Sequence, residues 1–274
     1  MDKNRLNELY EKADLIRKMT IESIAHFGVG HIGGSASIVE ILTSLYYECA
    51  NVDPKNPNWA ERDRIVLSKG HAAVALYSAL ASKGYFDKSL LLTLNENGTS
   101  LPSHADMLKV KGVDFTAGSL GQGISAAVGM AINAKIENSN YHTYAIVGDG
   151  ESQEGQVWEA VMLAGSKKLN NFTVFVDNNK MQIDGMTDDV CKVDPFEDKY
   201  KAFGFKTYTV DGHDIEALVD AINDAKKSDI PTAIICNTIK GKGVKCCEGT
   251  YKSHSVAFTE ELFKAECTGE VLTK

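Results

Sequence analysis

The chain has 274 residues, of which 43% are hydrophobic and 24% are charged. These fractions are close to those of average globular proteins, so they exclude a disordered, collagen-like or membrane-embedded chain. There are 29 Lys and Arg residues against 37 Asp and Glu, and the formal net charge is -8. We therefore expect no nucleic-acid partner and no membrane partner, although a local basic pocket for a phosphate is compatible with this charge.

Cysteine usage and the N-terminus both indicate a cytoplasmic protein. The six cysteines include no Cys-x-x-Cys pair, and the vicinal Cys246 and Cys247 suit neither an ordinary disulfide nor a tetrahedral zinc site. Free thiols are typical of a reducing compartment. The first 20 residues carry charges throughout and lack the apolar segment of a signal peptide. No uncharged apolar stretch reaches the roughly 18 residues of a membrane-spanning helix.

The first half of the chain reads as helices joined by loops, with one short strand. Residues 4–27 have apolar side chains near helical spacing and predict an amphipathic helix. A glycine-rich loop follows, after which Ser35 is placed to cap the next helix. The remaining elements that we expect here are a helix over 36–50, a strand over 65–67, a helix over 72–83 and a loop-rich stretch over 95–117.

The second half alternates strands and helices. We expect strands over 144–147, 172–176, 205–210 and 232–236, and helices over 122–137, 152–168 and 214–227. This alternation predicts an α/β fold with a parallel sheet that is covered by helices on both faces. There is no repeat and no linker rich in Pro, Gly or Ser, so residues 1–274 are predicted to form a single domain with a helical, loop-rich N-terminal section.

Polar residues follow two consecutive predicted strands. Asp149 comes just after one strand, and Asn178 and Asn179 come just after the next. The carboxyl ends of neighbouring parallel strands meet at the ligand-binding edge of the sheet. Carboxylate and amide oxygens suit magnesium or calcium better than zinc, and the flanking Gly148 and Gly150 allow backbone N–H groups to approach an anion. The alternative is that Asp149 caps a helix and the asparagines form a turn.

Several longer motifs of the chain resemble those of one known protein family. The segment GDGESQEG at 148–155, followed by DNNKMQIDG at 177–185, resembles the thiamine diphosphate-binding motif. The chain as a whole resembles the N-terminal, diphosphate-binding part of transketolase. Three further segments agree with this family in their order along the chain: GHIGG at 30–34, SKGH at 68–71 and TAGSLGQGIS at 116–125. In contrast, the glycine-rich segment at 118–123 lacks the order of a dinucleotide fingerprint, and Gly241-Lys-Gly243 lacks the spacing of a P-loop.

The resemblance implies a role for each matching residue. Asp149, Asn179 and the main-chain oxygen of Met181 would bind Mg2+, with Ca2+ or Mn2+ as substitutes. Gly148 and Gly150 would lie beside the diphosphate. Met181 and Ile183 would pack on the thiazolium ring, and Gly118 and Leu120 would lie beside the aminopyrimidine. Glu154 and Glu159 would help to link two active sites across a dimer interface.

Four of the seven histidines match family positions. His31 and His104 would bind hydroxyl groups of the sugar and assist proton transfer, and His71 would lie near the cofactor diphosphate. His254 would serve both the diphosphate and the substrate. Histidine suits these roles because its proton exchanges near neutral pH. The other three histidines, His26, His142 and His213, have no such context and are expected to be structural.

The expected activity is transfer of a two-carbon ketol unit from a ketose or ketose phosphate to an aldose, with thiamine diphosphate as cofactor. The family also needs a pyrimidine-binding half that carries an activating glutamate, and we find no such half in 274 residues. We therefore expect a split transketolase with a separate C-terminal subunit, arranged as α2β2. Three alternatives stay open at this point: a deoxyxylulose-phosphate synthase-like subunit, a 2-oxoacid dehydrogenase-like subunit, and a catalytically silent assembly subunit. The donor and the acceptor also stay open.

Overall fold

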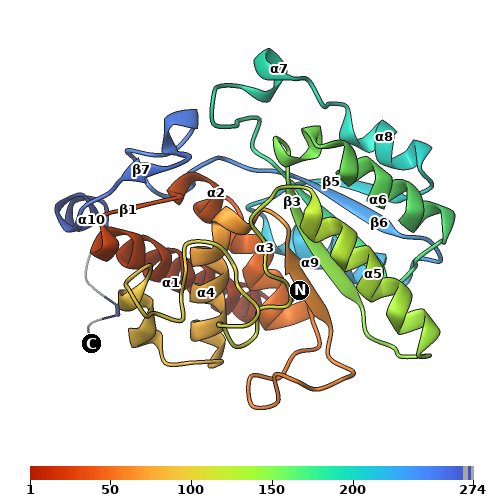
Figure 1. Ribbon diagram of the computed structural model, residues 1–274, viewed down its shortest axis with the longest axis horizontal. Coiled ribbons are helices and arrows are strands. Elements are labelled where there is room, and N and C mark those ends of the chain that lie inside the picture. The colour runs from red at the N-terminus through yellow and green to blue at the C-terminus, as the bar shows by residue number, and fades with distance from the viewer. Residues whose placement is uncertain (268–270, 273–274) are drawn as a thin grey trace.

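A five-stranded parallel sheet runs through the molecule (Figure 1). The computed structural model describes residues 1–267 and 271–272. The strand order is β2-β3-β4-β6-β5, and every neighbouring pair is parallel. This confirms the predicted α/β class. The strands are β2 (Arg64–Leu67), β3 (Thr143–Gly148), β4 (Phe172–Asn178), β5 (Lys206–Asp211) and β6 (Thr232–Asn237).

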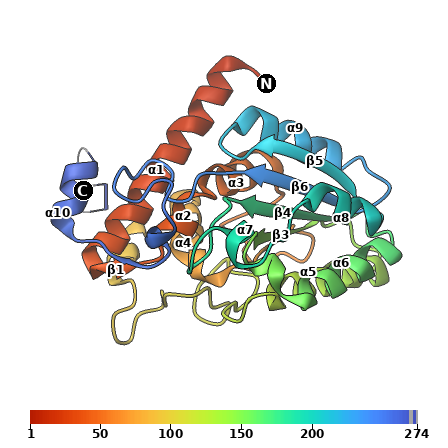
Figure 2. The same ribbon diagram turned by 90° about the horizontal axis from the view of Figure 1, so that it is seen from above.

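Helices cover both faces of the sheet, as the alternating pattern predicted (Figure 2). Because successive side chains of a strand point to opposite faces, each strand contributes to two cores. On one face, Val147 and Val176 pack with helices α5 (Gln122–Ile136), α6 (Gly155–Ser166) and α8 (Phe196–Ala202). On the other face, Ile146 and Phe175 join the larger core, which contains α1 (Lys3–Phe27), α3 (Val39–Ser44), α4 (Ala73–Lys83) and α9 (Ile215–Ala225).

The helix predicted over 36–50 is divided into three pieces. These are α2 (Ile32–Ala36), α3 and a π-helical turn over Leu45–Cys49. Ser35 is wrong as a cap, because it lies inside α2. The break has a physical cause: the Arg17 guanidinium donates to the carbonyl of Ala36 at 2.8 Å, and the Ser37 hydroxyl donates to Asp177 Oδ2 at 2.7 Å. The Arg17 bond occupies the Ala36 carbonyl, which would otherwise accept a helical N–H, and the Ser37 bond ties the break to β4.

The helix predicted over 152–168 begins later than expected. A 3-10 turn over Glu151–Gln153 comes first, and α6 begins at Gly155 after an extended Glu154. Consequently no α-helix starts directly after Asp149. The structure also contains elements that the sequence did not predict. They are α7 (Thr187–Val190), α8, α10 (Glu260–Glu266), 3-10 turns at Gly70–Ala72, Lys88–Thr93 and Tyr251–Ser253, and an antiparallel pair of β1 (Val29–Gly30) with β7 (Val256–Ala257).

The remaining predicted helices and strands agree with the structure to within two residues at each end. Across the described part of the chain, no helix combines the length and the apolar character needed to cross a membrane.

Candidate active site

A cavity of about 220 Å3 opens at the carboxyl edge of the sheet, around the residues that follow β2, β3, β4 and β6. Parallel sheets bind ligands at this edge because the loops after the strands leave a crevice there. The structure brings ten of the residues expected from the sequence to this cavity: His71, Leu120, Gly148, Asp149, Gly150, Glu154, Asn179, Met181, Ile183 and His254.

Asp149 follows β3 and reaches the loop after β4. Its carboxylate accepts hydrogen bonds from the N–H groups of Gly150, at 2.7 Å, and of Lys180. Burial, and to a smaller extent the carboxylate of Asp177, raises the pKa of Asp149 to about 7. A bound cation would offset both effects, because it favours the charged carboxylate.

Asn179 and Met181 supply two further oxygen atoms. The amide of Asn179 is held at both ends: Nδ2 donates to Asp177 Oδ2 at 3.0 Å, and Oδ1 accepts the N–H of Met181 at 3.1 Å. The carbonyl oxygen of Met181 accepts Lys240 Nζ at 3.1 Å, so this oxygen already contacts a cationic group. A carboxylate, an amide oxygen and a carbonyl oxygen are hard donors. The set therefore fits Mg2+.

Within residues 1–267 and 271–272, no three His, Cys, Asp or Glu side chains gather in a way that could hold a metal ion. A metal at this edge would therefore depend on the mixed set of Asp149, Asn179 and the Met181 carbonyl.

A buried ion pair lies beneath the cavity. Lys69 Nζ donates to Asp177 Oδ2 at 2.6 Å, and the two side chains are 2% and 0% exposed. Burial alone would raise the pKa of Asp177. The Lys69 ammonium, together with hydrogen bonds from Lys69, Thr238 and Ser37, outweighs burial and holds that pKa below its ordinary value. Asp177 therefore stays ionised and orients the Asn179 amide.

Two lysines give the cavity a positive side. Lys69 follows β2 and also donates to the Gly34 carbonyl at 2.8 Å, whereas Lys240 follows β6. Burial and the neighbouring Lys69 lower the pKa of Lys240 to about 8. Lys69 is already paired with Asp177, so it is the Lys240 ammonium that can attract an anionic ligand, and a diphosphate fits this requirement.

Glu151 is a buried carboxylate that joins three loops around the cavity. Its Oε1 accepts the Ser68 hydroxyl at 2.5 Å and the Gly121 N–H at 2.9 Å, and its Oε2 accepts the Gly148 N–H at 3.0 Å. The N–H of Gly148, which we expected to approach an anion, is thus used inside the protein. Gly148 lines the cavity without offering that donor. Gly150 approaches Gln182 closely, because a Cβ on Gly150 would lie 3.1 Å from the Cβ of Gln182.

Four histidines gather beside the cavity, although they come from distant parts of the sequence. The ring centroid of His31 lies 5.4 Å from that of His71, 5.6 Å from that of His104 and 5.4 Å from that of His254. The centroids of His71 and His254 are 4.9 Å apart. The structure thus brings together all four histidines that match the family.

Partial burial keeps these four imidazoles neutral. It is the largest cause that lowers each pKa, and nearby Lys69 and Lys240 add to the effect at His71 and His254. The pKa of His254 falls to about 4. A neutral imidazole has one nitrogen that accepts a proton and one that donates a hydrogen bond. The cluster can therefore bind hydroxyl groups and accept a proton at neutral pH.

Some expected residues lie outside the cavity lining. His31 and His104 belong to the histidine cluster but do not line the cavity, and neither does Gly118. Glu159 is exposed on α6 and is also outside the lining. Its expected role at an interface between subunits stays a prediction.

The other three histidines lie away from the cavity. His142 is buried and shares a hydrogen bond of 2.8 Å with the Thr173 hydroxyl. His26 lies 3.4 Å from Glu260, and His213 contacts Glu40.

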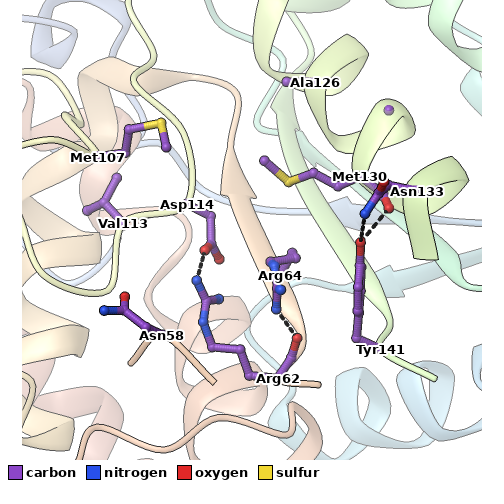
Figure 3. Close-up of a pocket in the computed structure, with 11 residues that line it drawn as sticks. Asn58, Arg62, Arg64, Met107, Val113, Asp114, Ala126, Met130, Asn133 and Tyr141 are labelled. Atoms are coloured by element: carbon purple, nitrogen blue, oxygen red, sulfur yellow. Dashed lines mark hydrogen bonds and ion pairs between the residues drawn. The ribbon is translucent and has the colours of Figure 1, made fainter. Parts of the chain in front are cut away.

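A second, larger hollow of about 590 Å3 lies between α5, the start of β2 and residues 107–114 (Figure 3). Its two arginines are engaged within the chain. Arg62 pairs with Asp114 at 2.5 Å, and Arg64 lies over the Tyr141 ring at 4.4 Å. None of the candidate site residues lines this hollow, whereas ten of them line the cavity at the sheet edge.

Fold and cavity together define the class: an α/β protein whose sheet edge offers hard oxygen donors for a divalent cation and a lysine ammonium for a phosphate ligand. The family model described as "Transketolase, thiamine diphosphate binding domain" matches residues 10–267. The chain belongs to the transketolase family and corresponds to its N-terminal, thiamine diphosphate-binding part, as the motifs predicted. It is accordingly a thiamine diphosphate-dependent transferase.

Relatives and solved structures support this assignment. The 6-deoxy-6-sulfo-D-fructose transketolase subunit SqwG of Clostridium sp. (strain MSTE9) is 52% identical over 259 residues, which cover 94% of each chain. An apulose-4-phosphate transketolase subunit of Actinobacillus succinogenes is 39% identical over 90% of each chain. The solved transketolase of Campylobacter jejuni superimposes with a TM-score of 0.87 at 35% identity. The match covers 93% of this chain but only 41% of that one.

Four residues that build the site were not predicted from the sequence: Lys69, Glu151, Asp177 and Lys240. The first three lie within the quoted motifs at 68–71, 148–155 and 177–185, but no role was assigned to them. Lys240 follows the predicted strand over 232–236, so its place after a strand was the available signal. That signal was not enough, because the position of this strand within the sheet was unknown.

Proposed function

We propose that this chain is the diphosphate-binding subunit of a two-component transketolase and that it works in an α2β2 assembly with a separate C-terminal, pyrimidine-binding subunit. The observation that carries the proposal is the match to proteins that are themselves named as subunits, over 94% and 90% of their own lengths. Glu154, just before α6, and Glu159, in its second turn, are exposed and in this proposal would contact such a partner. The six free cysteines support a reducing cytoplasm as its location.

In this proposal Asp149, Asn179 and the Met181 carbonyl hold Mg2+, for which Ca2+ or Mn2+ can substitute. The diphosphate would lie beside Lys69, Lys240, His71, His254 and the backbone of Gly150, and the rings of the cofactor would lie beside Leu120, Met181 and Ile183. The family pattern also assigns Gly118 to the aminopyrimidine ring. Bound thiamine diphosphate supplies the carbanion chemistry that breaks and forms the carbon–carbon bond.

The remaining work belongs to the histidines. His31, His104 and His254 orient the hydroxyl groups of the sugar through their neutral rings, and they accept or return the proton of a hydroxyl group at the reacting carbon. Burial among one another and beside Lys240 favours the neutral form, which is the form able to accept that proton.

For the donor we propose a ketose with a terminal sulfonate, 6-deoxy-6-sulfo-D-fructose. Identity is 52% to the subunit named for this sugar, against 39% and 36% to two subunits named for apulose-4-phosphate. Removal of carbons 1 and 2 would leave a four-carbon aldose that keeps the sulfonate, and the two carbons would extend the acceptor aldehyde.

The test uses this chain co-purified with the subunit that is encoded beside it, with Mg2+ and thiamine diphosphate added. Two-carbon transfer to glyceraldehyde 3-phosphate is measured from 6-deoxy-6-sulfo-D-fructose, fructose 6-phosphate and sedoheptulose 7-phosphate in parallel. We expect transfer from the sulfonated sugar to have the highest kcat/KM. The variant Asp149→Ala should lose both transfer and cofactor binding. The matched control is Asp189→Ala, at an exposed acidic residue of α7 outside the cavity lining, which should keep both.

Each outcome has a definite reading. Preference for a phosphorylated ketose would refute the sulfonate assignment and leave the transketolase assignment intact. Full activity of Asp149→Ala would refute the metal site. No transfer from any ketose, in a complex that binds thiamine diphosphate, would favour the catalytically silent subunit.

A further inference from the structure

A charged cluster lies outside the cavity and has no part in the mechanism above. Arg17 of α1, Glu40 of α3 and His213, which precedes α9, have side chains that are only 11%, 7% and 12% exposed. Arg17 pairs with Glu40 Oε1, and the other oxygen, Oε2, lies 2.9 Å from His213 Nδ1. Buried charges are costly unless they are paired and fully hydrogen-bonded, so each remaining polar atom of the cluster should have a partner.

One of these partners is the Ala36 carbonyl, which accepts from Arg17 at 2.8 Å, and two others lie in the turn at residues 239–243. His213 Nε2 accepts the N–H of Ile239 at 2.9 Å, and Arg17 donates to the carbonyl of Lys242 at 2.9 Å. Because Nε2 accepts from a backbone N–H, it carries no proton. The ring is therefore the tautomer that is protonated on Nδ1 and donates to Glu40. The cluster thus holds the turn from both ends, through one acceptor and one donor.

Close packing strengthens this connection. Gly243 has a φ of +79°, and a Cβ at this position would lie 2.7 Å from Arg17 Cδ. The turn therefore rests directly on the Arg17 side chain, where no other residue type fits. A third tie comes from the Gly241 N–H, which donates to the carbonyl of Gly33 at 3.0 Å.

Lys240 is carried by this turn. Its ammonium lies 3.1 Å from the Met181 carbonyl and 3.4 Å from His254 Nδ1, inside the cavity. A lysine side chain has several rotatable bonds, so its backbone must be fixed if the ammonium is to meet a ligand without a large loss of entropy.

We propose that Arg17, Glu40 and His213 form a positioning network that fixes the 239–243 turn and thereby places the Lys240 ammonium for the anionic cofactor. The inference rests on the proposed function, because it assumes that thiamine diphosphate binds in this cavity. His213 is a positioning residue, since it acts through Ile239 and Lys240 and does not line the cavity.

The experiment is a double-mutant cycle on the co-purified complex. The dissociation constant of thiamine diphosphate is measured by calorimetry at saturating Mg2+ for the unmodified complex, His213→Leu, Lys240→Met and the double variant. Leucine removes the acceptor for the Ile239 N–H, so we expect affinity to fall about tenfold. In the Lys240→Met background the same substitution should cost less than about twofold, because the group that it positions is already gone.

A conservative variant separates positioning from loss of structure. Glutamine can offer an amide oxygen to the Ile239 N–H, so His213→Gln should keep cofactor affinity within about threefold of the unmodified complex. Urea unfolding of each variant shows whether the chain is folded during the binding measurement.

Three results would overturn the inference. The first is an equal loss of thiamine diphosphate affinity from His213→Leu in the unmodified and the Lys240→Met backgrounds. The second is unchanged affinity in His213→Leu, and the third is unchanged affinity in Lys240→Met. Asp149→Ala separates these from failure of the proposed function. If that variant loses cofactor binding while His213→Leu does not, only the positioning network is refuted. If neither variant alters binding, the cavity is not the cofactor site and both proposals fail.

Discussion

The Lys69–Asp177 pair can be tested by removing its positive partner. In Lys69→Met the carboxylate of Asp177 would remain, with 0% of its side chain exposed and no cation beside it. Breaking a buried pair in this way costs roughly 3–5 kcal/mol. Asp177 would keep hydrogen bonds from Ser37 at 2.7 Å and Asn179 at 3.0 Å, and one from Thr238. These bonds place the expected loss near the lower end, at about 3 kcal/mol.

The assay is urea unfolding of the purified chain, followed by circular dichroism and extrapolated to water. The double variant Lys69→Met/Asp177→Asn is the control. It removes both charges, so it should recover at least half of the loss. The reasoning is refuted if Lys69→Met costs less than about 1 kcal/mol, or if the double variant is less stable than the single one.

The same pair makes a prediction about acid. The pKa of Asp177 is lowered in the folded protein, so its stabilising contribution is complete above the ordinary carboxyl pKa, about 4. The contribution should be lost as the pH falls further and Asp177 takes up a proton. In Lys69→Met this part of the acid sensitivity should shrink, because the pairing is already broken.

Three further variants test the packing and the buried charges by urea unfolding. Gly165→Ala should destabilise the fold by about 3 kcal/mol or more, since the new Cβ would lie 1.8 Å from the Phe203 carbonyl oxygen. Gly129→Ala, in open space on α5, should instead stabilise the fold by about 0.5 kcal/mol. Equal effects of the two substitutions would contradict this packing. Burial lowers the pKa of His142 to about 3, so the unfolded chain binds the extra proton first and the free energy of unfolding should decrease as the pH drops below about 6.5, by up to about 1.4 kcal/mol per pH unit. His142→Gln should lessen that slope. An unchanged slope would count against a neutral His142. Glu151→Gln should cost about 2 kcal/mol, because one amide N–H would face a backbone N–H; a neutral effect would argue against the hydrogen-bonding scheme.

The sequence predicted those features that depend on local pattern or on the nearest strand. The periodic segments gave most helices and strands, because side-chain periodicity follows directly from backbone geometry. Asp149 and Asn179 could be placed together since β3 and β4 are consecutive and adjacent. The order β4-β6-β5 could not be read from the chain, and it is this order that brings Lys240 next to Met181.

Long-range contacts account for the other differences. The break between α2 and α3 depends on Arg17 and Asp177, which lie far away in the sequence. The late start of α6 follows from Glu151, whose carboxylate bonds to Gly121 and Gly148. A local propensity argument contains neither contact, so it extends the helix in both cases.

The short antiparallel pair of β1 and β7 has a consequence for how the site is completed. It joins Val29 to Ala257 and Gly30 to Val256, immediately beside His31 and His254. The histidine cluster therefore closes only when segments near opposite ends of the chain have met. During synthesis, the strands of the sheet could pair before the last segment emerges, but the histidine cluster and the part of the larger core that contains Phe258 and Phe263 could not form. A nascent chain that stops short of β7 would therefore lack both the closed histidine cluster and this part of the core, so the site is completed only when the chain is almost fully made.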